Sequence, residues 1–393
     1  MSEWKKVKLK DCCHSISDGD HLPPPKSESG VPFITIANID VANHIDFGNT
    51  MFVPFEYYDN LNDIRKAKCN DILYSVVGSF GKPVLIKENI PFAFQRHIAI
   101  LRPNNEIAES RFLYYIMLTR DFYMQADTVA IGAAQRTISL TALRNMEVEL
   151  PPMEIQHRIA SILSRYDSLI ENYQKQIKLL EEAAQRLYKE WFVDLHFPGH
   201  ENVKIVDGVP EGWEKKKLIE LVDVQYGYAF DGRLFNSNRE GMPILRIRNI
   251  PDGITSDYTT EEASEDYIVH NGDIVVGMDG IFHINSWSGD DAYLVQRACS
   301  FRPKEEYMKG FVFLAIQEPI KFFEKTLVGA TVAHLGKKHI DSIELCVPKN
   351  FELYQPFSKF YNQRQGLLSQ IRILTEARDR LLPKLMSGEI KVS

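Results

Sequence analysis

Arginine, lysine, glutamine and histidine recur at turn-rich places in both halves of this chain, and proteins use these side chains to bind DNA. Arginine can donate two hydrogen bonds to guanine, glutamine can bond twice to adenine, and lysine neutralises phosphate. The candidates are Lys26, Ser79, Lys82, Gln95, Arg96, Gln135, Arg136, Arg233, Arg246, His283, Arg297, His334, Lys337 and Lys338. Surface turns are polar in any protein, so composition alone leaves an ordinary solvent-exposed role open as well.

Motifs that would support catalysis are incomplete. Residues 22–26 and 150–153 carry consecutive prolines, but both lack the polar residue and the aromatic ring of the Asn-Pro-Pro-Tyr signature of adenine methyltransferases. Residues 329–338 look like a phosphate-binding loop, yet their glycines are too far apart, and Lys338 stands where serine or threonine would bind magnesium. We therefore expect no catalytic site in this chain.

Metal sites are not indicated either. His14 and His21 lie near two aspartates, but their spacing fits no common zinc site. The five cysteines are an odd number without a Cys-x-x-Cys pair, which favours reduced thiols over disulfides or zinc. We expect this chain to carry no metal and no cofactor of its own.

Composition is that of an ordinary globular protein, with 25% charged and 44% hydrophobic residues among 393. No apolar run approaches the roughly 20 residues of a membrane span, and we expect a cytoplasmic protein. The net charge of -7 argues against a protein that coats nucleic acid along its whole surface. A local basic cleft remains compatible with it.

The elements that must position these side chains are organised around residues 154–192, which read as one helix of about ten turns. Its apolar residues recur every seven positions, as in a coiled-coil seam. The rows are Ile159, Tyr166, Tyr173, Leu180 and Leu187; Ile155, Ile162, Leu169 and Ala183; and Ile170, Ile177, Ala184 and Trp191. A stripe of three rows predicts contact with more than one partner helix. Residues 354–386 repeat this pattern, with rows that include Leu368 and Leu382.

The two halves of the chain match each other in the same order. The matching stretches are residues 4–9 with 213–218, 30–39 with 241–250, 70–78 with 272–280, Gln95-Arg96 with Gln296-Arg297, Gln135-Arg136 with His334, and 132–151 with 329–348. This order indicates tandem duplication of a mixed domain followed by a long helix. An antiparallel helix pair would place the two domains at opposite ends of a rod roughly 50 to 55 Å long.

The whole layout resembles the specificity (S) subunit of type I restriction-modification enzymes. The motifs that carry this resemblance are residues 19–26, 30–33, 94–103 and 140–152 with the following helix, and residues 227–230, 277–280, 296–297, 334–339 and 381–388. The resemblance implies an α+β fold in which two tandem mixed α/β target-recognition domains are separated by two long helices that form an antiparallel coiled coil. The expected domains are residues 1–151 and 201–349, with helical spacers at 152–200 and 350–393.

The resemblance also implies partners. Each domain would read one half of a split double-stranded DNA sequence, and the spacers would dock two modification subunits that methylate adenine at N6 with S-adenosylmethionine. Restriction subunits that use ATP and magnesium would complete the assembly, and the S subunit itself is not catalytic. The side chains expected to dock partners are Ile170, Ile177, Trp191, Leu368 and Leu382.

One inference follows from the repeat itself. Two domains that read different half-sites cannot discriminate through residues that they share, so the shared Gln95, Arg96, Gln296 and Arg297 should build the framework or hold phosphates. For Arg96 and Arg297, pairing inside the fold stays open. Base readers should lie where the halves diverge, at Ser79, Lys82, Gln135, Arg136, Arg233, His283, Val332 and His334.

Three alternatives remain open from the sequence. The chain could be an inactive relative that assembles with methyltransferase subunits without selecting DNA. It could be a stand-alone nuclease or methyltransferase with unrecognised motifs, or a coiled-coil scaffold without DNA. The duplicated, glycine-punctuated domains count against the scaffold.

Overall fold

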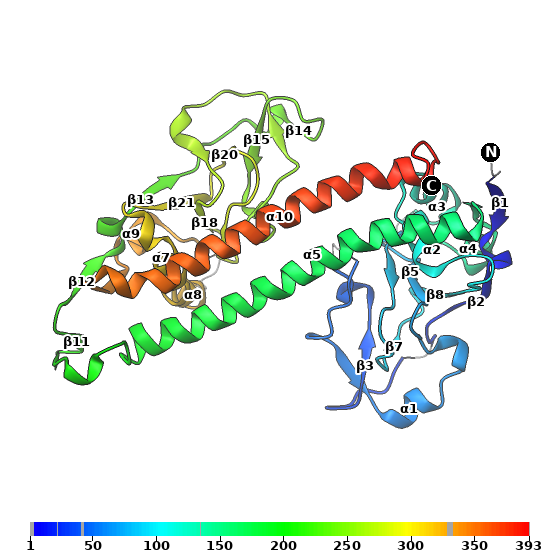
Figure 1. Ribbon diagram of the computed structural model, residues 1–393, viewed down its shortest axis with the longest axis horizontal. Helices are drawn as coiled ribbons and strands as arrows, with labels where there is room; N and C mark the ends of the chain where they lie inside the picture. Colours follow the sequence, from blue (N-terminus) through cyan, green and yellow to red (C-terminus); the bar gives the residue numbers. More distant parts are fainter. Residues whose placement is uncertain (1–3, 22, 41–42, 134, 328–332, 393) are drawn as a thin grey trace. The chain divides into compact units, whose positions relative to one another are not determined.

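The computed structural model describes residues 4–21, 23–40, 43–133, 135–327 and 333–392. The chain forms two compact units, residues 1–168 with 376–393 (unit 1) and residues 169–375 (unit 2). Two long helices, α5 (Met153–Tyr188) and α10 (Gln355–Met386), each contribute one segment to each unit (Figure 1).

Unit 1 is built on a four-stranded antiparallel sheet with the order β2-β8-β5-β6. A three-stranded sheet, β4-β3-β7, and a separate pair, β1 with β9, complete its strands. Their bounds are β1 Lys5–Lys8, β2 Cys13–Asp18, β3 Val31–Ile34, β4 Met51–Val53, β5 Ile72–Ser75, β6 Pro83–Leu85, β7 Ala93–Phe94, β8 Ile98–Pro103 and β9 Glu147–Leu150. The helices are α1 Phe55–Asp59, α2 Ser110–Met117, α3 Arg120–Val129 and α4 Leu140–Asn145.

The central sheet of unit 1 is buried on both faces. Successive side chains of each strand point to opposite faces of the sheet, so neighbouring residues belong to different cores. Ala99 and Leu101 of β8 face a core that includes the start of α5, whereas Ile98 and Ile100 face a second core. The helices that cover the first core begin at capping residues. Thr119 accepts a hydrogen bond from the Phe122 amide before α3, and Ser139 caps α4 in the same way.

Unit 2 repeats this architecture. Its four-stranded antiparallel sheet has the order β13-β21-β18-β19, and a five-stranded sheet has the order β14-β16-β15-β20-β17. The strand bounds are β10 Ile205–Val206, β11 Val209–Pro210, β12 Trp213–Lys217, β13 Val222–Tyr226, β14 Phe235–Asn236, β15 Met242–Leu245, β16 Tyr258–Thr259, β17 Ile268–Val269, β18 Ile274–Gly277, β19 Ile284–Ser286, β20 Ala292–Leu294, β21 Ala298–Pro303 and β22 Glu344–Pro348. The helices are α6 Leu218–Leu221, α7 Lys309–Ala315, α8 Gln317–Thr326 and α9 Lys337–Asp341.

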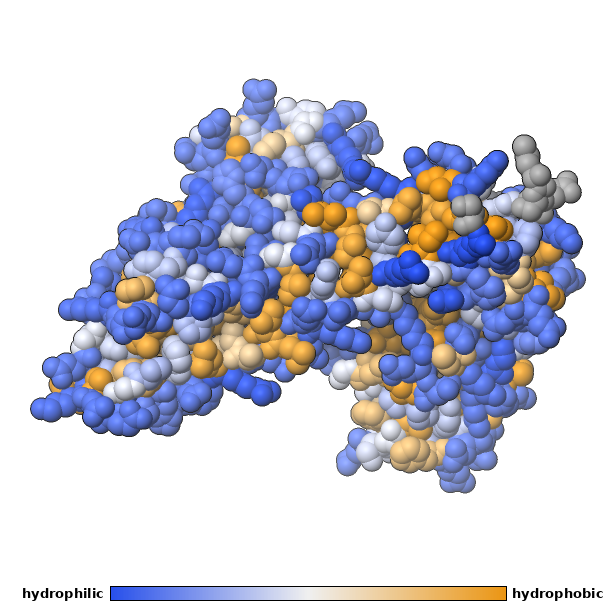
Figure 2. Space-filling view, viewed as in Figure 1, coloured by the Kyte–Doolittle hydropathy of each residue, from blue (hydrophilic) through white to orange (hydrophobic). Residues whose placement is uncertain are grey.

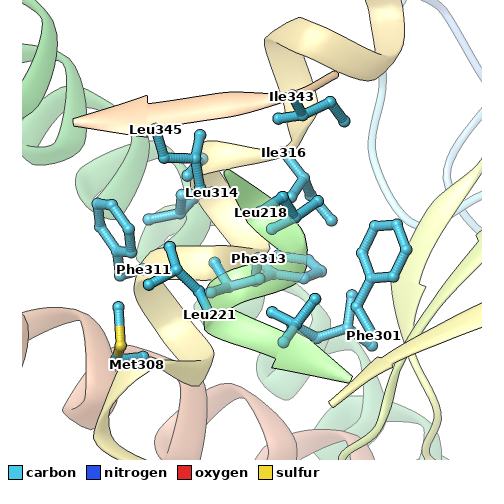
Figure 3. Close-up of a cluster of buried hydrophobic side chains, with 14 of the residues drawn as sticks. Leu218, Leu221, Phe301, Met308, Phe311, Phe313, Leu314, Ile316, Ile343 and Leu345 are labelled. Atoms are coloured by element: carbon cyan, nitrogen blue, oxygen red, sulfur yellow. The ribbon is translucent and has the colours of Figure 1, made fainter. Parts of the chain in front are cut away.

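The larger core of unit 2 joins this sheet to α6 and α7 and to segments of both long helices. Leu218, Phe301 and Phe311 converge in it from three different elements (Figure 3). Phe192 lies 4.8 Å from Phe311 and 5.5 Å from Phe357 between ring centroids, so the residues that follow α5 pack against both α7 and the start of α10.

Equivalent glycines confirm that the halves share one backbone plan. Gly30 has φ 138° and Gly241 has φ 81°, values that favour glycine. A Cβ atom would lie 2.2 Å from the Val53 oxygen at Gly30 and 2.1 Å from the Thr259 oxygen at Gly241. Each glycine therefore permits one strand to approach the end of its neighbour closely.

The predicted helix over residues 154–192 is confirmed, since α5 continues through a π-helical turn, Lys189–Val193. The seam, however, differs from expectation. The buried row of α5 is Leu163, Ile170, Ile177 and Ala184, at intervals of seven. On α10 the buried positions include Phe357, Arg364 and Leu385, a row that contains one charged side chain.

In each unit the paired helix segments are held by an ion pair. Arg364 Nε donates to Glu181 Oε1 at 2.6 Å in unit 2, and Arg378 Nη1 donates to Asp167 Oδ1 at 2.8 Å in unit 1. In unit 2, residues later in α5 contact residues earlier in α10, since Tyr188 lies against Phe357. The helices therefore run antiparallel.

Among the described residues, no helix is long and apolar enough to cross a membrane.

Candidate nucleic-acid interface

Three loops meet at one edge of the central sheet in each unit, a place that we call the loop junction. In unit 2, Met278 donates its backbone N–H to the Arg297 oxygen at 2.8 Å, and its own oxygen accepts from the Leu335 amide at 2.7 Å. In unit 1, Val76 makes the same two bonds, with His97 at 2.9 Å and with Ile138 at 2.8 Å. The backbone thus gathers the loop after β5 or β18, the turn before β8 or β21, and the segment before α4 or α9.

This shared frame corrects two sequence matches. The hydrogen bonds place His97 opposite Arg297, so Gln95-Arg96 corresponds to Val295-Gln296 and not to Gln296-Arg297. In the same way, the amides of Gly78 and Gly280 donate to the oxygens of Arg136 and Ala333, so His334 corresponds to Thr137. The two Gln-Arg dipeptides are therefore displaced by one residue when the backbones of the two units are aligned. As a result, the side chains at the two junctions differ more than the sequence match suggested.

Side chains at the unit 2 junction form a charged cluster. Asp279 Oδ1 lies 2.6 Å from His334 Nδ1, and Asp279 Oδ2 lies 3.0 Å from Arg297 Nη1. The structure thus brings together two of the predicted DNA-binding residues through a carboxylate that the sequence had marked only as part of a glycine motif. Lys337 and Lys338, exposed at the start of α9, follow directly after this segment.

Side chains at the unit 1 junction are arranged differently. The Arg136 guanidinium pairs with Asp127 and lies 5.4 Å from the centre of the Phe80 ring. Because those contacts occupy Arg136, it is better placed to brace the loop than to reach a base. Gln135 and Ser79 are exposed at the junction, and Lys82 lies half-buried where the loop returns to β6.

The turn before β8 carries two further predicted residues of unit 1. Gln95 is half-buried and forms a bridge with Asp20, while Arg96 is exposed at the tip of the turn. Arg96 donates its backbone amide to the Asp20 oxygen at 3.1 Å. Their backbones therefore belong to the framework of the turn, and the Arg96 side chain faces solvent beside the junction loops.

The remaining predicted residues lie away from the junctions or behind them. Lys26 is exposed next to Ser27, which pairs with β4. Arg233 is exposed and hydrogen bonds to Asp231, an interaction that lowers the pKa of that carboxyl. Arg246 lies 5.3 Å from the Phe235 ring centre. His283 is half-buried and lines a cavity of about 350 Å³ that Arg364 also lines, and Val332 lies outside the described residues.

One ion pair is repeated in both frameworks, and the sequence comparison did not identify it. Arg102 Nη2 lies 2.9 Å from Asp71 Oδ2, and Arg302 Nε lies 3.2 Å from the corresponding oxygen of Asp273. Both aspartates are buried. The Asp-Ile and Arg-Pro dipeptides recur in both halves of the sequence. The sequence does not show, however, that the aspartate of one dipeptide pairs with the arginine of the other.

The residues expected to dock partners are mostly turned inward. Ile170 and Ile177 are buried in the chain itself, Trp191 packs against Phe357 with ring centroids 5.8 Å apart, and Leu382 packs on the core of unit 1. Leu368 is half-buried. The row that the sequence assigned to a partner is thus the row that α5 turns toward its own chain, and a docking role for these side chains stays a prediction.

A different apolar surface lies between the unit 2 segments of α5 and α10. It is a groove of about 530 Å³ lined by Leu179, Leu180, Ala183 and Leu367, with glutamines at its margins. Leu179 is exposed over most of its side chain. Figure 2 shows hydrophobic side chains along the displayed face of this helix pair.

Within the described part of the chain, no group of three or more histidine, cysteine, aspartate or glutamate side chains could hold a metal ion. The acidic and histidine side chains at the end of β2 are instead engaged with neighbouring polar groups. Asp18 lies 2.8 Å from His21, and Asp20 accepts hydrogen bonds from Tyr57 and Arg65. This polar cluster ties the loop after β2 to the segment around α1.

Comparisons with known proteins agree with this architecture. Residues 1–182 and 210–374 match the family described as the type I restriction modification DNA specificity domain. The MjaIX specificity subunit of Methanocaldococcus jannaschii is 28% identical over 312 residues, which cover 72% of this chain and 69% of that protein. The MjaVIII specificity subunit of the same organism is 27% identical over 347 residues, 82% of this chain and 80% of that protein.

A solved structure has the same fold. The S subunit of a type I restriction-modification system from M. genitalium superposes with a TM-score of 0.60 at 18% identity, covering 97% of this chain and 96% of that one. Since the family match extends over both halves, it accounts for the duplicated domains and for the long helices that follow them. The chain belongs to the type I restriction modification DNA specificity domain family, and it is a specificity subunit with two target-recognition domains.

Proposed function

We propose that this subunit reads a split double-stranded DNA target, with one half-site contacted by residues 1–151 (domain 1) and the other by residues 201–349 (domain 2). The observation that carries this proposal is the loop junction, where the same backbone hydrogen bonds support different side chains in the two units. A common frame with variable tips suits two domains that bind DNA in one manner and select different bases.

Within this proposal, base contacts come from Gln135, Ser79 and Lys82 in domain 1 and from Arg297, His334 and His283 in domain 2. Phosphates are held by Lys26, Arg233, Lys337 and Lys338, since exposed cations contribute binding that does not depend on the base sequence of the DNA. In this proposal the side chains of Arg96 and Arg246 also belong to the DNA-binding surface. The buried ion pairs and the close-contact glycines shape the frame and read nothing.

The helical spacers, residues 152–200 and 350–393, set the separation of the half-sites and dock the other subunits in this proposal. Two modification subunits methylate adenine N6 with S-adenosylmethionine, and restriction subunits use ATP and magnesium. The groove around Leu179 and Leu367 supports docking, because an apolar groove between two helices is a common place for a partner helix to bind.

Adenine methylation sequenced in DNA from cells that carry this chain with its modification subunits tests the proposal, with cells that lack only this chain as the control. We expect a split motif, methylated on each strand, that disappears with the chain. An assembled complex that produces no such difference contradicts DNA selection. Methyl transfer by the purified chain alone contradicts a purely recognising role.

A further inference from the structure

The carboxylate of Asp279 is the least exposed member of the unit 2 junction cluster. Its side chain is 19% exposed, whereas those of His334 and Arg297 are 60% and 67% exposed. One carboxylate oxygen contacts each partner, at 2.6 Å for His334 Nδ1 and 3.0 Å for Arg297 Nη1. Asp279 is therefore placed to orient two side chains that face solvent.

The contact with His334 fixes the position of the imidazole proton. A carboxylate oxygen only accepts hydrogen bonds, so the proton of the neutral ring must lie on Nδ1. The other ring nitrogen, Nε2, then carries a lone pair and is an acceptor. Without the carboxylate, the neutral ring could exchange the two tautomers, and Nε2 would be an acceptor in one and a donor in the other.

The backbone holds the three residues in place. Asp279 and His334 form an isolated antiparallel bridge, and the Gly280 amide donates to the Ala333 oxygen at 3.0 Å. Arg297 adopts φ 72°, a left-handed conformation that is uncommon for a residue with a long side chain. This conformation persists in a tight turn whose neighbours determine it, so the guanidinium starts from a fixed base.

We propose that Asp279 is a positioning residue for base selection by domain 2. It presents His334 Nε2 as a hydrogen-bond acceptor and Arg297 as an adjacent donor. In the major groove an acceptor of this kind selects an exocyclic amino group, on adenine N6 or cytosine N4, against the carbonyl oxygens of guanine and thymine. This inference rests on the proposed reading of one half-site by each domain.

The equivalent junction in unit 1 lacks this arrangement among its described residues. Val77 stands at the position of Asp279, Thr137 at that of His334, and His97 at that of Arg297. An apolar side chain at the central position orients no ring and can contact a thymine methyl group. The device is therefore specific to domain 2, and its loss should leave the half-site of domain 1 unchanged.

The test uses the subunit assembled with its modification subunits and a DNA library randomised in both half-sites. Asp279→Asn keeps the size of the side chain but removes the charge, and an amide can either accept from Nδ1 or donate to it. We expect the preference for an amino-bearing base at one position of one half-site to fall about tenfold, the scale of one base-specific contact. Gln135→Ala identifies the half-site of domain 1, which should keep its preference in Asp279→Asn.

Asp257→Asn is the matched control, because Asp257 is 17% exposed and pairs with Arg248 at 2.6 Å outside the junction. It should leave both half-sites unchanged. The ¹⁵N chemical shifts of the His334 ring give an independent readout, since the wild type should show the proton on Nδ1 and Asp279→Asn should show a mixture of tautomers.

Three results would separate the explanations. Unchanged base preference in Asp279→Asn overturns the inference and leaves the proposed function intact. Weaker binding to all sequences equally also overturns it, because a merely structural carboxylate acts in that way. A wild-type complex without a split preference overturns the proposed function and the inference together.

Discussion

Arg364 of α10 donates its Nε hydrogen to Glu181 of α5 at 2.6 Å, within the buried contact of the two helices in unit 2. Its Nη2 donates to Asn285 at 2.9 Å, and its guanidinium lies 5.1 Å from the Phe313 ring centre. One side chain thus connects both helices to strand β19 and to α7. Ion pairs inside a helix seam contribute register specificity, because a shifted pairing would leave a charge buried alone.

The first prediction concerns this pair. Arg364→Ala should lower the unfolding free energy of unit 2 by about 3 kcal/mol, since it removes a buried cation and leaves its acceptors unpaired. Glu181→Ala should cost less, because Glu181 is partly exposed. A double-mutant cycle, measured by hydrogen exchange in unit 2, should give a coupling of about 1 to 2 kcal/mol. Asp290→Ala, which breaks an exposed pair with Arg372, is the control and should cost well under 1 kcal/mol. Additive single effects would contradict a direct interaction.

The second prediction separates steric contact from backbone conformation at glycine. Gly241 and Gly212 have similar φ values, 81° and 85°, but only Gly241 faces a nearby carbonyl oxygen, whereas the space around Gly212 is open for at least 4 Å. Gly212→Ala should cost about 1 to 2 kcal/mol for the left-handed conformation alone. Gly241→Ala should cost clearly more in denaturant unfolding, and equal costs would show that the strands move apart without penalty.

The third prediction assigns the repeated ion pair to the framework. Asp71→Asn should destabilise unit 1 by about 3 kcal/mol, because Arg102 then loses its buried partner. The purified complex that still folds should keep the wild-type base preference at both half-sites. Asp273→Asn should do the same in unit 2, and a changed base preference in either variant would place these residues in readout instead.

Much of the architecture follows from the sequence, because it depends on patterns repeated over long stretches. The helix over residues 154–192, the tandem duplication and the strands that precede each helix could all be predicted from periodicity and order. The register of a two-residue turn was missed, because the identical residue types at Gln95-Arg96 and Gln296-Arg297 outweighed a shift of one position that the backbone hydrogen bonds show.

Side-chain pairing was also beyond the sequence. Asp279 reaches His334 across 55 positions, and Arg136 turns back to Asp127, so no local pattern marks either pair. The seam of α5 was ambiguous for a related reason. Several rows are equally apolar, and the row chosen by folding depends on where the domain cores meet the helix, at Leu163 in unit 1 and at Ala184 in unit 2.

The fourth prediction concerns pH. Burial, followed by the charge of Lys338, lowers the pKa of His339 below its ordinary value of 6.5. The Gly336 amide donates to His339 Nδ1 at 3.0 Å, so the neutral ring is the form that the fold holds. With the folded pKa below the unfolded one, this contribution is complete above pH 6.5 and is lost as pH falls through the folded value.

When the pH falls from about 7.5 to about 5.5, the midpoint temperature of thermal unfolding of unit 2 should therefore decrease more in the wild type than in His339→Gln. Glutamine keeps a hydrogen-bond acceptor that does not titrate. The two proteins should agree most closely at the higher pH. An identical pH dependence in both would show that His339 does not couple protonation to folding.

The fifth prediction tests the role of the helical spacers. Inserting one heptad into α5 after Lys175 and one into α10 after Gln370 keeps the apolar row facing the same way, because seven residues restore the phase of the seam. Each insertion adds about 10 Å of helix, close to the rise of three base pairs. If the helices set the spacing, methylation sequencing should find both half-sites unchanged and separated by up to about three more base pairs. An insertion of two residues in α5 alone is the control, since it rotates the following part of the row by about 200° and should impair assembly instead. A complex with the paired heptads that keeps the original spacing would show that the DNA, or another subunit, fixes the distance.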